Sequence, residues 1–372
     1  MRRRCLLVMM ALMPLMAVAQ TEGGEKSRNI VVKGVMWVKT LIDSMAVNGV
    51  DRDYIEQPEL PWAVELRTSV SQSFMKLESD WPLPEGNTLK FNASSDNGFS
   101  TSIGAWLGYR GYGFGLSKEL SSGSGSTLSF GAMGGSFGIN LRINSYRSEQ
   151  PEIFLDVDVA GERFSDRNKV ELADPIRVRT LFLDGYYMFN GKHFSYAAAY
   201  DQSLIQRRSA GSLVAGLMYY HSRISYNDDS NWPMLMLMNN IGKSKLTQAS
   251  VGVGYAYNWV PARGWLVSAQ AMPMVTFYNK MKIYSYKLIG EDGLDFYESD
   301  NTYDDYTLEE DEVTKTNNRV SWNFDARLCL CYHWSRYYVR AYGHYNRFRY
   351  SNDDGSGRLT DWTAYASLGF RF

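Results

Sequence analysis

Hydrophobic and polar residues alternate one by one along many segments of this chain. In residues 248–259, every second position is apolar and the positions between them are small or polar. The same alternation runs through residues 320–332, and tryptophan or tyrosine stands near the ends of both apolar sets. A period of two residues is that of a β-strand, in which successive side chains point to opposite faces. The pattern therefore predicts an all-β protein whose strands each have one apolar and one polar face.

The length of these segments and the aromatic residues at their ends favour a membrane barrel over a soluble sandwich. The alternating runs exceed the ~5 to 6 residues typical of strands in soluble sheets and match the ~9 to 11 that cross a bilayer at a tilt. Aromatic residues at the ends of apolar runs are typical of the interfacial girdle of such barrels. They are Trp62, Tyr257, Trp259, Trp265, Trp322, Tyr332 and Trp362. We therefore predict a transmembrane antiparallel up-and-down β-barrel.

The number of strands has two readings, both even, as a bacterial barrel requires. Fourteen is favoured. Twelve results if Gly134 and Gly135 form a bulge that merges 126–133 with 136–146, and if 152–159 is a loop. The candidate strands are 62–76, 98–109, 112–120, 126–133, 136–146, 152–159, 178–189, 193–203, 211–225, 247–260, 264–279, 319–333, 336–350 and 361–372.

Both readings put the long connections on one side of the membrane and the short turns on the other. The connections 227–246, 280–318 and 351–360 are predicted to be extracellular, and the turns 260–263 and 333–335 periplasmic. Eleven acidic residues and no basic residue occupy positions 291–312. We expect a solvated, mobile surface loop there, or alternatively loose capture of divalent cations that bridge lipopolysaccharide.

The N-terminus reads as a secretory leader. Arg2 to Arg4 precede an apolar run of 11 residues, Leu6 to Met16, and a small-x-small site ends at Ala19. We predict a signal peptide at 1–19, a periplasmic segment at 20–60 and the barrel at 61–372. Apolar residues at helical spacing predict a short amphipathic helix over 29–47. No segment has the ~20 apolar residues of a transmembrane helix.

Charge and cysteine content exclude some classes of function. The chain has 39 Lys and Arg against 40 Asp and Glu, and loss of three leader arginines leaves 36, a balance of −4. A nucleic-acid partner is therefore not expected. Cys329 and Cys331 are predicted to be free interior thiols, and the four histidines are scattered singly. We expect no metal site and no cofactor.

Charged residues on the polar faces of the strands are candidates for the barrel lumen, because a charge that faces lipid at mid-depth costs ~2 to 4 kcal/mol. We expect salt-bridge and hydrogen-bond networks that fill the lumen, or alternatively the lining of a selective pore. Summing hairpin positions to 668 puts Arg340 opposite Leu328, so that Asp325 could bridge to Arg327 or Arg340. The lumen-facing candidates are Glu65, Arg67, Arg142, Asp201, Asp325, Arg327, Arg340 and His344.

Two Ser–His pairs raise the question of an enzyme, because some membrane barrels use serine with histidine as a hydrolase or acyltransferase site. His193 and Ser195 would face the same way on a strand, and His221 and Ser222 opposite ways. Neither pair has a third orienting group at a recognisable spacing. We therefore predict that the protein is not an enzyme and assign no catalytic residue.

The C-terminal strand, 361–372, alternates and ends on Phe372, which resembles the signal by which the β-barrel assembly machinery recognises outer-membrane barrels. Other stretches resemble a Bacteroidota barrel family catalogued as domain of unknown function 4421. They are 49–56 with Pro61-Trp62, 188–196 with 206–212, 252–258 with Trp265, and 369–372. The resemblance implies a barrel in the outer membrane of a Gram-negative cell and assigns no functional residue.

The sequence thus predicts an outer-membrane barrel with a polar, largely filled lumen and a structural or interaction role. The alternative is a porin-like passive or gated channel for small polar solutes, and a hydrolase or acyltransferase is a remote third. The expected partners are outer-membrane lipid, lipopolysaccharide and, during insertion, the assembly machinery. The oligomeric state is left open.

Overall fold

The computed structural model describes residues 49–82, 88–96, 99–121, 125–148, 152–159, 162–169, 172, 174–231, 235, 240–290, 306–317, 320–351 and 355–372. The chain divides after Gly49, and Val50–Phe372 forms the unit that contains the strands. The predicted signal peptide and the predicted helix at 29–47 lie outside the described residues.

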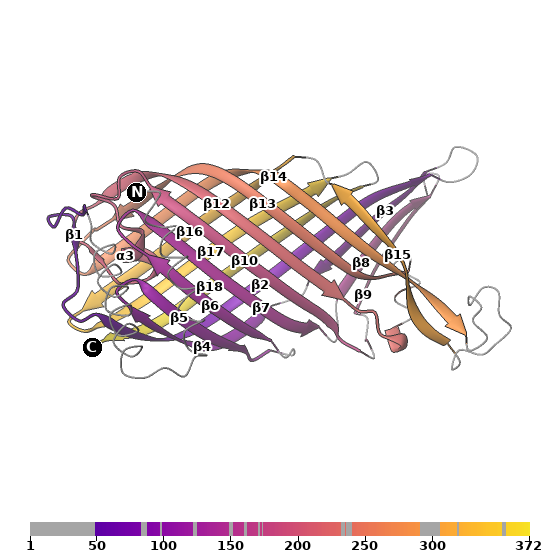
Figure 1. Ribbon diagram of the computed structural model, residues 1–372, viewed down its shortest axis with the longest axis horizontal. Coiled ribbons are helices and arrows are strands. Elements are labelled where there is room, and N and C mark those ends of the chain that lie inside the picture. Colours follow the sequence, from indigo (N-terminus) through magenta and orange to yellow (C-terminus); the bar gives the residue numbers. More distant parts are fainter. Residues whose placement is uncertain are drawn as a thin grey trace, which may run out of the picture. The chain divides into compact units, whose positions relative to one another are not determined.

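Twelve antiparallel strands close into a barrel, in which each strand pairs with its neighbours along the wall and β18 pairs with β2 (Figure 1). The pairing of β18 with β2 closes the barrel and runs without a break from Arg371 opposite Ala63 to Gly355 opposite Ser79. The wall strands are β2 (Trp62–Pro82), β4 (Ser100–Tyr109), β5 (Tyr112–Glu119), β6 (Ser126–Met133), β7 (Phe137–Ser148), β10 (Ile176–Met188), β12 (Ala210–Ser225), β13 (Ile241–Trp259), β14 (Trp265–Gly290), β16 (Ser321–Trp334), β17 (Tyr337–Ser351) and β18 (Gly355–Arg371). The predicted transmembrane barrel fold is confirmed, with the smaller of the two strand numbers.

Further strands extend the wall at the end away from Phe372 (Figure 1). The part of β2 farther from Phe372 pairs with β3 (Thr88–Asp96). β3 in turn pairs with β8 (Glu152–Val159), and β8 pairs with β9 (Glu162–Lys169). The outer half of β14 pairs with β15 (Tyr306–Asn317). These extensions lengthen β2 to 21 residues and β14 to 26 residues.

Two of the fourteen candidate strands are not part of the wall. Segment 152–159 is a strand, but it pairs with β3 and β9 outside the closed barrel. Segment 193–203 contains the helix α3 (Tyr196–Tyr200) instead of a strand. The proposed merger at Gly134-Gly135 is also wrong, because β6 and β7 are separate strands that pair with each other as a hairpin.

The tight turns gather at the barrel end that carries Trp62 and Phe372. They join β4 to β5, β6 to β7, β13 to β14 and β16 to β17. The strand ends that flank the three connections predicted to lie together, 227–246, 280–318 and 351–360, are at the opposite end. The β16–β17 turn corrects the predicted register: Trp334 pairs with Tyr337 around Ser335, which has a φ of 51°, so Arg340 lies opposite Cys331 and not Leu328.

The outer face of the wall is apolar and the inner face is polar or closely packed. On β13, Val251, Val253 and Tyr255 are 48 to 59% exposed, whereas Ser250 and Asn258 on the other face are at most 1% exposed. Such a large exposed apolar surface needs a nonaqueous neighbour. Among the described residues, no helix is both long and apolar enough to cross a membrane.

One inward aromatic residue is seated in a socket of glycines. The Trp106 indole lies so close to Gly113 that a Cβ there would come within 2.2 Å of the ring, and at Gly115 within 2.6 Å. The same ring receives the Arg67 guanidinium at 4.2 Å from its centroid. Glycine at these positions therefore lets the indole lie flat against β5.

Replacing Gly113 with valine is expected to lower the free energy of unfolding by about 1 to 3 kcal/mol, because overpacking displaces Trp106. Urea unfolding in detergent micelles, followed by tryptophan fluorescence, measures this. The matched control is Gly185→Val on β10, where the nearest atom to an added Cβ is at 4.0 Å. Equal effects of the two substitutions would contradict the socket.

Candidate functional site

The connector between β10 and β12, residues 189–209, has exposed ends but is largely buried from Phe194 to Gln206. Its helix α3 has all five residues buried, and Ser195 caps the helix by accepting the Ala198 N–H at 3.1 Å. Serine is a favoured N-cap residue, and the alanines that follow favour a helix. Cys329 of β16 donates its thiol to the Ala199 carbonyl at 3.1 Å. The connector therefore lies against the inner side of the wall.

Gln206 joins the connector, the approach to the first strand and the wall. Its Oε1 accepts the Ser195 N–H at 2.9 Å and the side-chain amide of Asn258 on β13 at 3.0 Å. Its Nε2 donates to the carbonyls of His193 at 2.6 Å and Arg208 at 2.9 Å. Gln206 is itself part of β11 (Ile205–Gln206), which pairs with β1 (Ile55–Glu56). This one side chain thus bonds to two parts of the connector and to the wall.

A buried arginine at the centre of the lumen ties the connector to several wall strands. Arg327 of β16 lies 3.1 Å from Asp184 of β10 and 3.4 Å from Asp325. Its guanidinium also donates to the Tyr196 hydroxyl of α3 at 2.6 Å and to the Tyr186 hydroxyl. Since β10 and β16 are not neighbours in the wall, these contacts cross the lumen.

The two carboxylates of this Arg327 cluster have further partners. Asp325 accepts from Gln270 at 3.0 Å, and Asp184 accepts from Asn140 at 2.7 Å. Asp325 is fully buried and Asp184 is 1% exposed. One cation therefore faces two carboxylates that are both hydrogen-bonded, as buried charges require.

A second buried cluster surrounds Glu65 on β2. Its carboxylate lies 2.6 Å from Arg67 and 2.8 Å from Arg340 of β17, and it accepts the Tyr338 hydroxyl at 2.7 Å. The partner of Arg340 is therefore Glu65 and not Asp325, because the register differs from the predicted one. The Arg371 guanidinium stacks over the Tyr338 ring at 4.8 Å. This cluster joins the first strand to the last two.

The remaining predicted lumen residues occupy two places. Arg142 of β7 meets the His344 ring of β17 at 2.7 Å, another contact between strands that are not neighbours in the wall. Asp201 is buried, but it follows α3 in the connector and does not lie on a strand. All eight candidates are thus buried or half-buried, and six of them are at most 8% exposed.

Several residues of these clusters were not anticipated. Asp184 sits on the same face of β10 as Phe182 and Tyr186, so its face reads as the apolar one. Tyr196 and Gln206 lie in the segment that alternation assigned to strands or turns. The Ser195-x-x-Ala198 cap and the alanine run were the signals that could have indicated α3.

The two Ser–His pairs are engaged in other contacts. Ser195 is fully buried and its hydroxyl accepts from α3, while His193 contacts Asp51 at 3.4 Å and Asn190 at 3.1 Å. His221 contacts Thr247 at 2.9 Å. Cys329 and Cys331 are free and buried, and the described residues contain no group of three or more potential metal ligands.

Part of the acidic segment 291–312 forms a strand, and two of its acidic residues form ion pairs with lysines. Residues 306–312 belong to β15, where Glu310 lies 3.2 Å from Lys243 and Asp311 lies 3.0 Å from Lys287. The expectation of a loop is therefore wrong for these residues, because they pair with β14, while Glu309, Glu310 and Asp311 are exposed as expected. Residues 291–305 lie outside the described residues.

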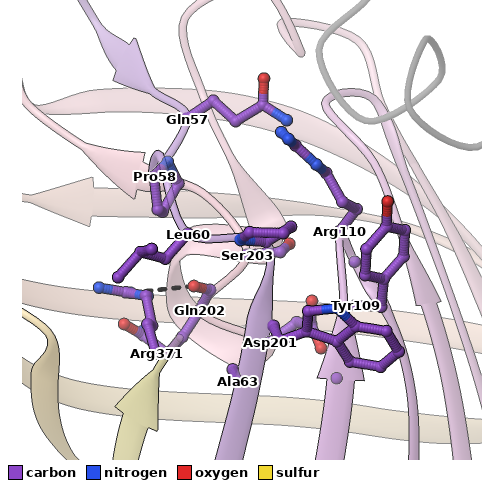
Figure 2. A pocket seen from close by; sticks show the side chains of 14 residues that line it. Gln57, Pro58, Leu60, Ala63, Tyr109, Arg110, Asp201, Gln202, Ser203 and Arg371 are labelled. Carbon is purple, nitrogen blue, oxygen red and sulfur yellow. Dashed lines mark hydrogen bonds between the residues drawn. The ribbon is translucent and has the colours of Figure 1, made fainter.

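A small pocket opens where the connector meets the approach to β2, at the end that carries Phe372 (Figure 2). It has about 330 Å³ of empty space, open solvent included. Arg371 crosses it and donates to the Gln202 carbonyl at 2.9 Å, with Asp201 and Ser203 beside it. The contact fastens the end of the connector to the last strand.

The family model described as "Domain of unknown function (DUF4421)" matches residues 49–372. The chain belongs to this DUF4421 family. The family membership inferred from the sequence is thereby confirmed, and the match covers the entire barrel of this DUF4421 protein. The comparison with curated proteins finds no match.

Solved structures similar to the DUF4421 chain are outer-membrane barrels. The protease OmpT from Escherichia coli is 8% identical, with 84% of this chain and 97% of that chain covered and a TM-score of 0.37. The translocator domain of the autotransporter NalP from Neisseria meningitidis is 10% identical, with 92% and 98% covered and a TM-score of 0.31. The COG4313 outer membrane channel from Pseudomonas putida F1 is 12% identical, with 85% and 97% covered and a TM-score of 0.28.

Proposed function

We propose that this DUF4421 protein is an outer-membrane barrel with a structural or interaction role, closed to solutes by its own connector. The observation that carries the proposal is the Arg327 cluster, which joins α3 to β10 and β16 across the lumen. The Gln206 contacts and the Glu65 cluster support it, because they fill the same interior near Phe372. A passive channel would need a continuous polar path through these contacts.

The membrane placement is part of the same proposal. The apolar outer face supports contact with lipid, and the turns at the Phe372 end support a periplasmic position for that end. The proposal includes a signal peptide at 1–19, a periplasmic segment at 20–60, a barrel from 61 and a Gram-negative host among the Bacteroidota. It includes no catalytic role, since Ser195 caps α3 and His193 binds Asp51.

Planar-bilayer conductance tests closure. We expect the wild-type protein to give no reproducible single-channel steps. Replacing residues 195–204 with a Gly/Ser chain of equal length removes α3 and the Tyr196 contact, and we expect this variant to show steps. Slower migration after boiling on a gel verifies that each variant still forms a barrel.

A Gly/Ser replacement of the exposed turn 260–263 is the control, because it loosens the same end without touching the lumen. It should remain silent. Regular steps from the wild-type protein would favour the channel alternative. Silence of a folded connector variant would mean that the wall side chains alone close the lumen and that the connector is not the closing element.

A further inference from the structure

Five basic residues form one row across five adjacent strands. The register pairs Arg179 of β10 with Arg223 of β12, and Arg223 with Lys245 of β13. Lys245 in turn pairs with Lys282 of β14, and Lys282 with Lys315 of β15. Directly paired residues share a face and neighbouring strands are ~4.8 Å apart, so the row is a continuous line of positive charge.

The row lies on the outer face of the wall. Along β12 it follows Leu217 and Tyr219, which are 55% and 36% exposed, while Ser222 on the opposite face is 5% exposed. On β14 a register shift opposite Ala249 and Ser250 brings Tyr278 and then Lys282 to this outer face. Arg179, Arg223 and Lys315 are exposed, and the two central lysines are half-buried.

The charges of this row are largely uncompensated. In the part of the chain that the structure describes, no carboxylate lies within 4.0 Å of Arg179, Arg223, Lys282 or Lys315. Lys245 donates to the Tyr284 hydroxyl at 2.9 Å, which leaves its charge in place. Like charges directly opposite each other on a sheet are destabilising. A bound polyanion would relieve that repulsion.

The height of the row matches a lipid headgroup. On β13, the stretch from Tyr257 to Thr247 contains eleven residues, and its ten steps rise roughly 25 Å along the membrane normal for a tilted strand, which is the height of an apolar band. Lys245 is the next outward residue. Tyr219 and Tyr278, which are 36% and 46% exposed, lie on the same face four residues below Arg223 and Lys282, where an interfacial girdle is expected.

A second basic group lies at the outer ends of β17, β18 and β2. There Arg349 pairs with Arg358, and Arg358 pairs with Lys76. These residues also share the outward face, as the exposed Ala364, Ala366 and Leu368 on β18 indicate. The same barrel end is therefore positive on two sides.

We propose that the row Arg179–Arg223–Lys245–Lys282–Lys315 binds the phosphate groups of the outer-leaflet phosphoglycolipid, the lipid A part of lipopolysaccharide. The inference rests on the proposed placement in the outer membrane, because it puts this end at the cell surface. Arginine and lysine form charge-assisted bonds with phosphate oxygens, and a line of cations on a lipid-facing wall fits two phosphates carried on one headgroup with acyl chains below.

Titration of lipid A into the full-length protein in detergent micelles, followed by native mass spectrometry, tests the site. The variant R223Q/K245Q/K282Q removes three central charges, and we expect it to bind roughly tenfold or more weakly. The matched control K192Q/R263Q/R336Q removes three exposed charges from the opposite end. The control should bind lipid A like the wild type. Lipid A without its phosphates should bind weakly to both the wild type and the control.

Equal lipid A affinity of the wild type and the central variant would overturn the proposal, as would an equal loss in the control. If phosphatidylglycerol binds the wild type as tightly as lipid A does, the row attracts anionic lipids in general and is not a specific phosphoglycolipid site. Conductance separates this inference from the proposed function, because the central variant should stay silent. If the wild type does not bind lipid A but gives no single-channel steps, only the lipid site is rejected. If the wild type conducts, only the proposed closure of the lumen is rejected.

Discussion

Replacing Arg327 with methionine is expected to lower the free energy of unfolding by about 3 to 5 kcal/mol, the usual cost of removing one partner from a buried ion pair. The substitution keeps an unbranched side chain and leaves Asp184 and Asp325 facing each other with no cation. It also removes the bond to Tyr196 of α3. Urea titration in micelles, monitored by tryptophan fluorescence, measures the loss.

The matched control is Arg177→Met, since Arg177 also pairs with a carboxylate, Asp174, at 3.0 Å, but its side chain is 53% exposed. Exposed pairs contribute about 1 kcal/mol or less. Adding Asp325→Asn to the Arg327 variant should recover part of the stability, because one uncompensated charge is then removed. A loss as small as that of the control would mean that Arg327 does not hold the cluster together.

Replacing Gln206 with leucine is expected to free the connector while leaving the wall strands paired. The change leaves the Ser195 N–H, the Asn258 amide and the His193 carbonyl without this partner. Each unsatisfied buried group costs about 1 to 3 kcal/mol, so the connector should lose several kcal/mol of local stability. Hydrogen exchange should accelerate in residues 193–208 and remain slow in β13 and β16.

Gln57→Leu is the control for this change, because Gln57 directly follows β1, the strand that pairs with β11, and is half-buried beside the pocket. Its exchange pattern should match that of the wild type. If the Gln206 variant instead exchanges faster throughout the barrel, the connector and the wall unfold as one unit, and the connector is not a separable plug.

Alternation along the chain was sufficient to predict the wall but not its contents. The outward Val251, Val253 and Tyr255 differ from their inward neighbours so clearly that each strand face could be assigned locally. The segment Phe194 to Tyr200 alternates as well, yet it contains α3, whose five residues are all buried. A strand pattern and a short buried helix cannot be separated by periodicity alone.

The partners within the lumen depend on distances that no local pattern encodes. Arg340 reaches Glu65 only because β18 closes against β2, and Arg327 reaches Asp184 only because β10 stands across from β16. Both depend on the strand number, which the sequence left at fourteen or twelve. The hairpin register was wrong for a smaller reason, since a turn centred one or two residues away moves every later pairing.

Closure of the barrel depends on the seam between β2 and β18. Trp62 and Phe372 exchange two backbone hydrogen bonds, at 3.2 and 3.0 Å, beside the β2–β18 seam. Until that seam forms, both strands expose unpaired edges along their full length, and such edges invite pairing with other chains. Ring closure between the two ends of the barrel must also offset the entropy of the longest loop in the molecule. The β2–β18 seam therefore removes the last two unpaired edges of the wall, and a chain in which it has not formed is expected to associate with other chains.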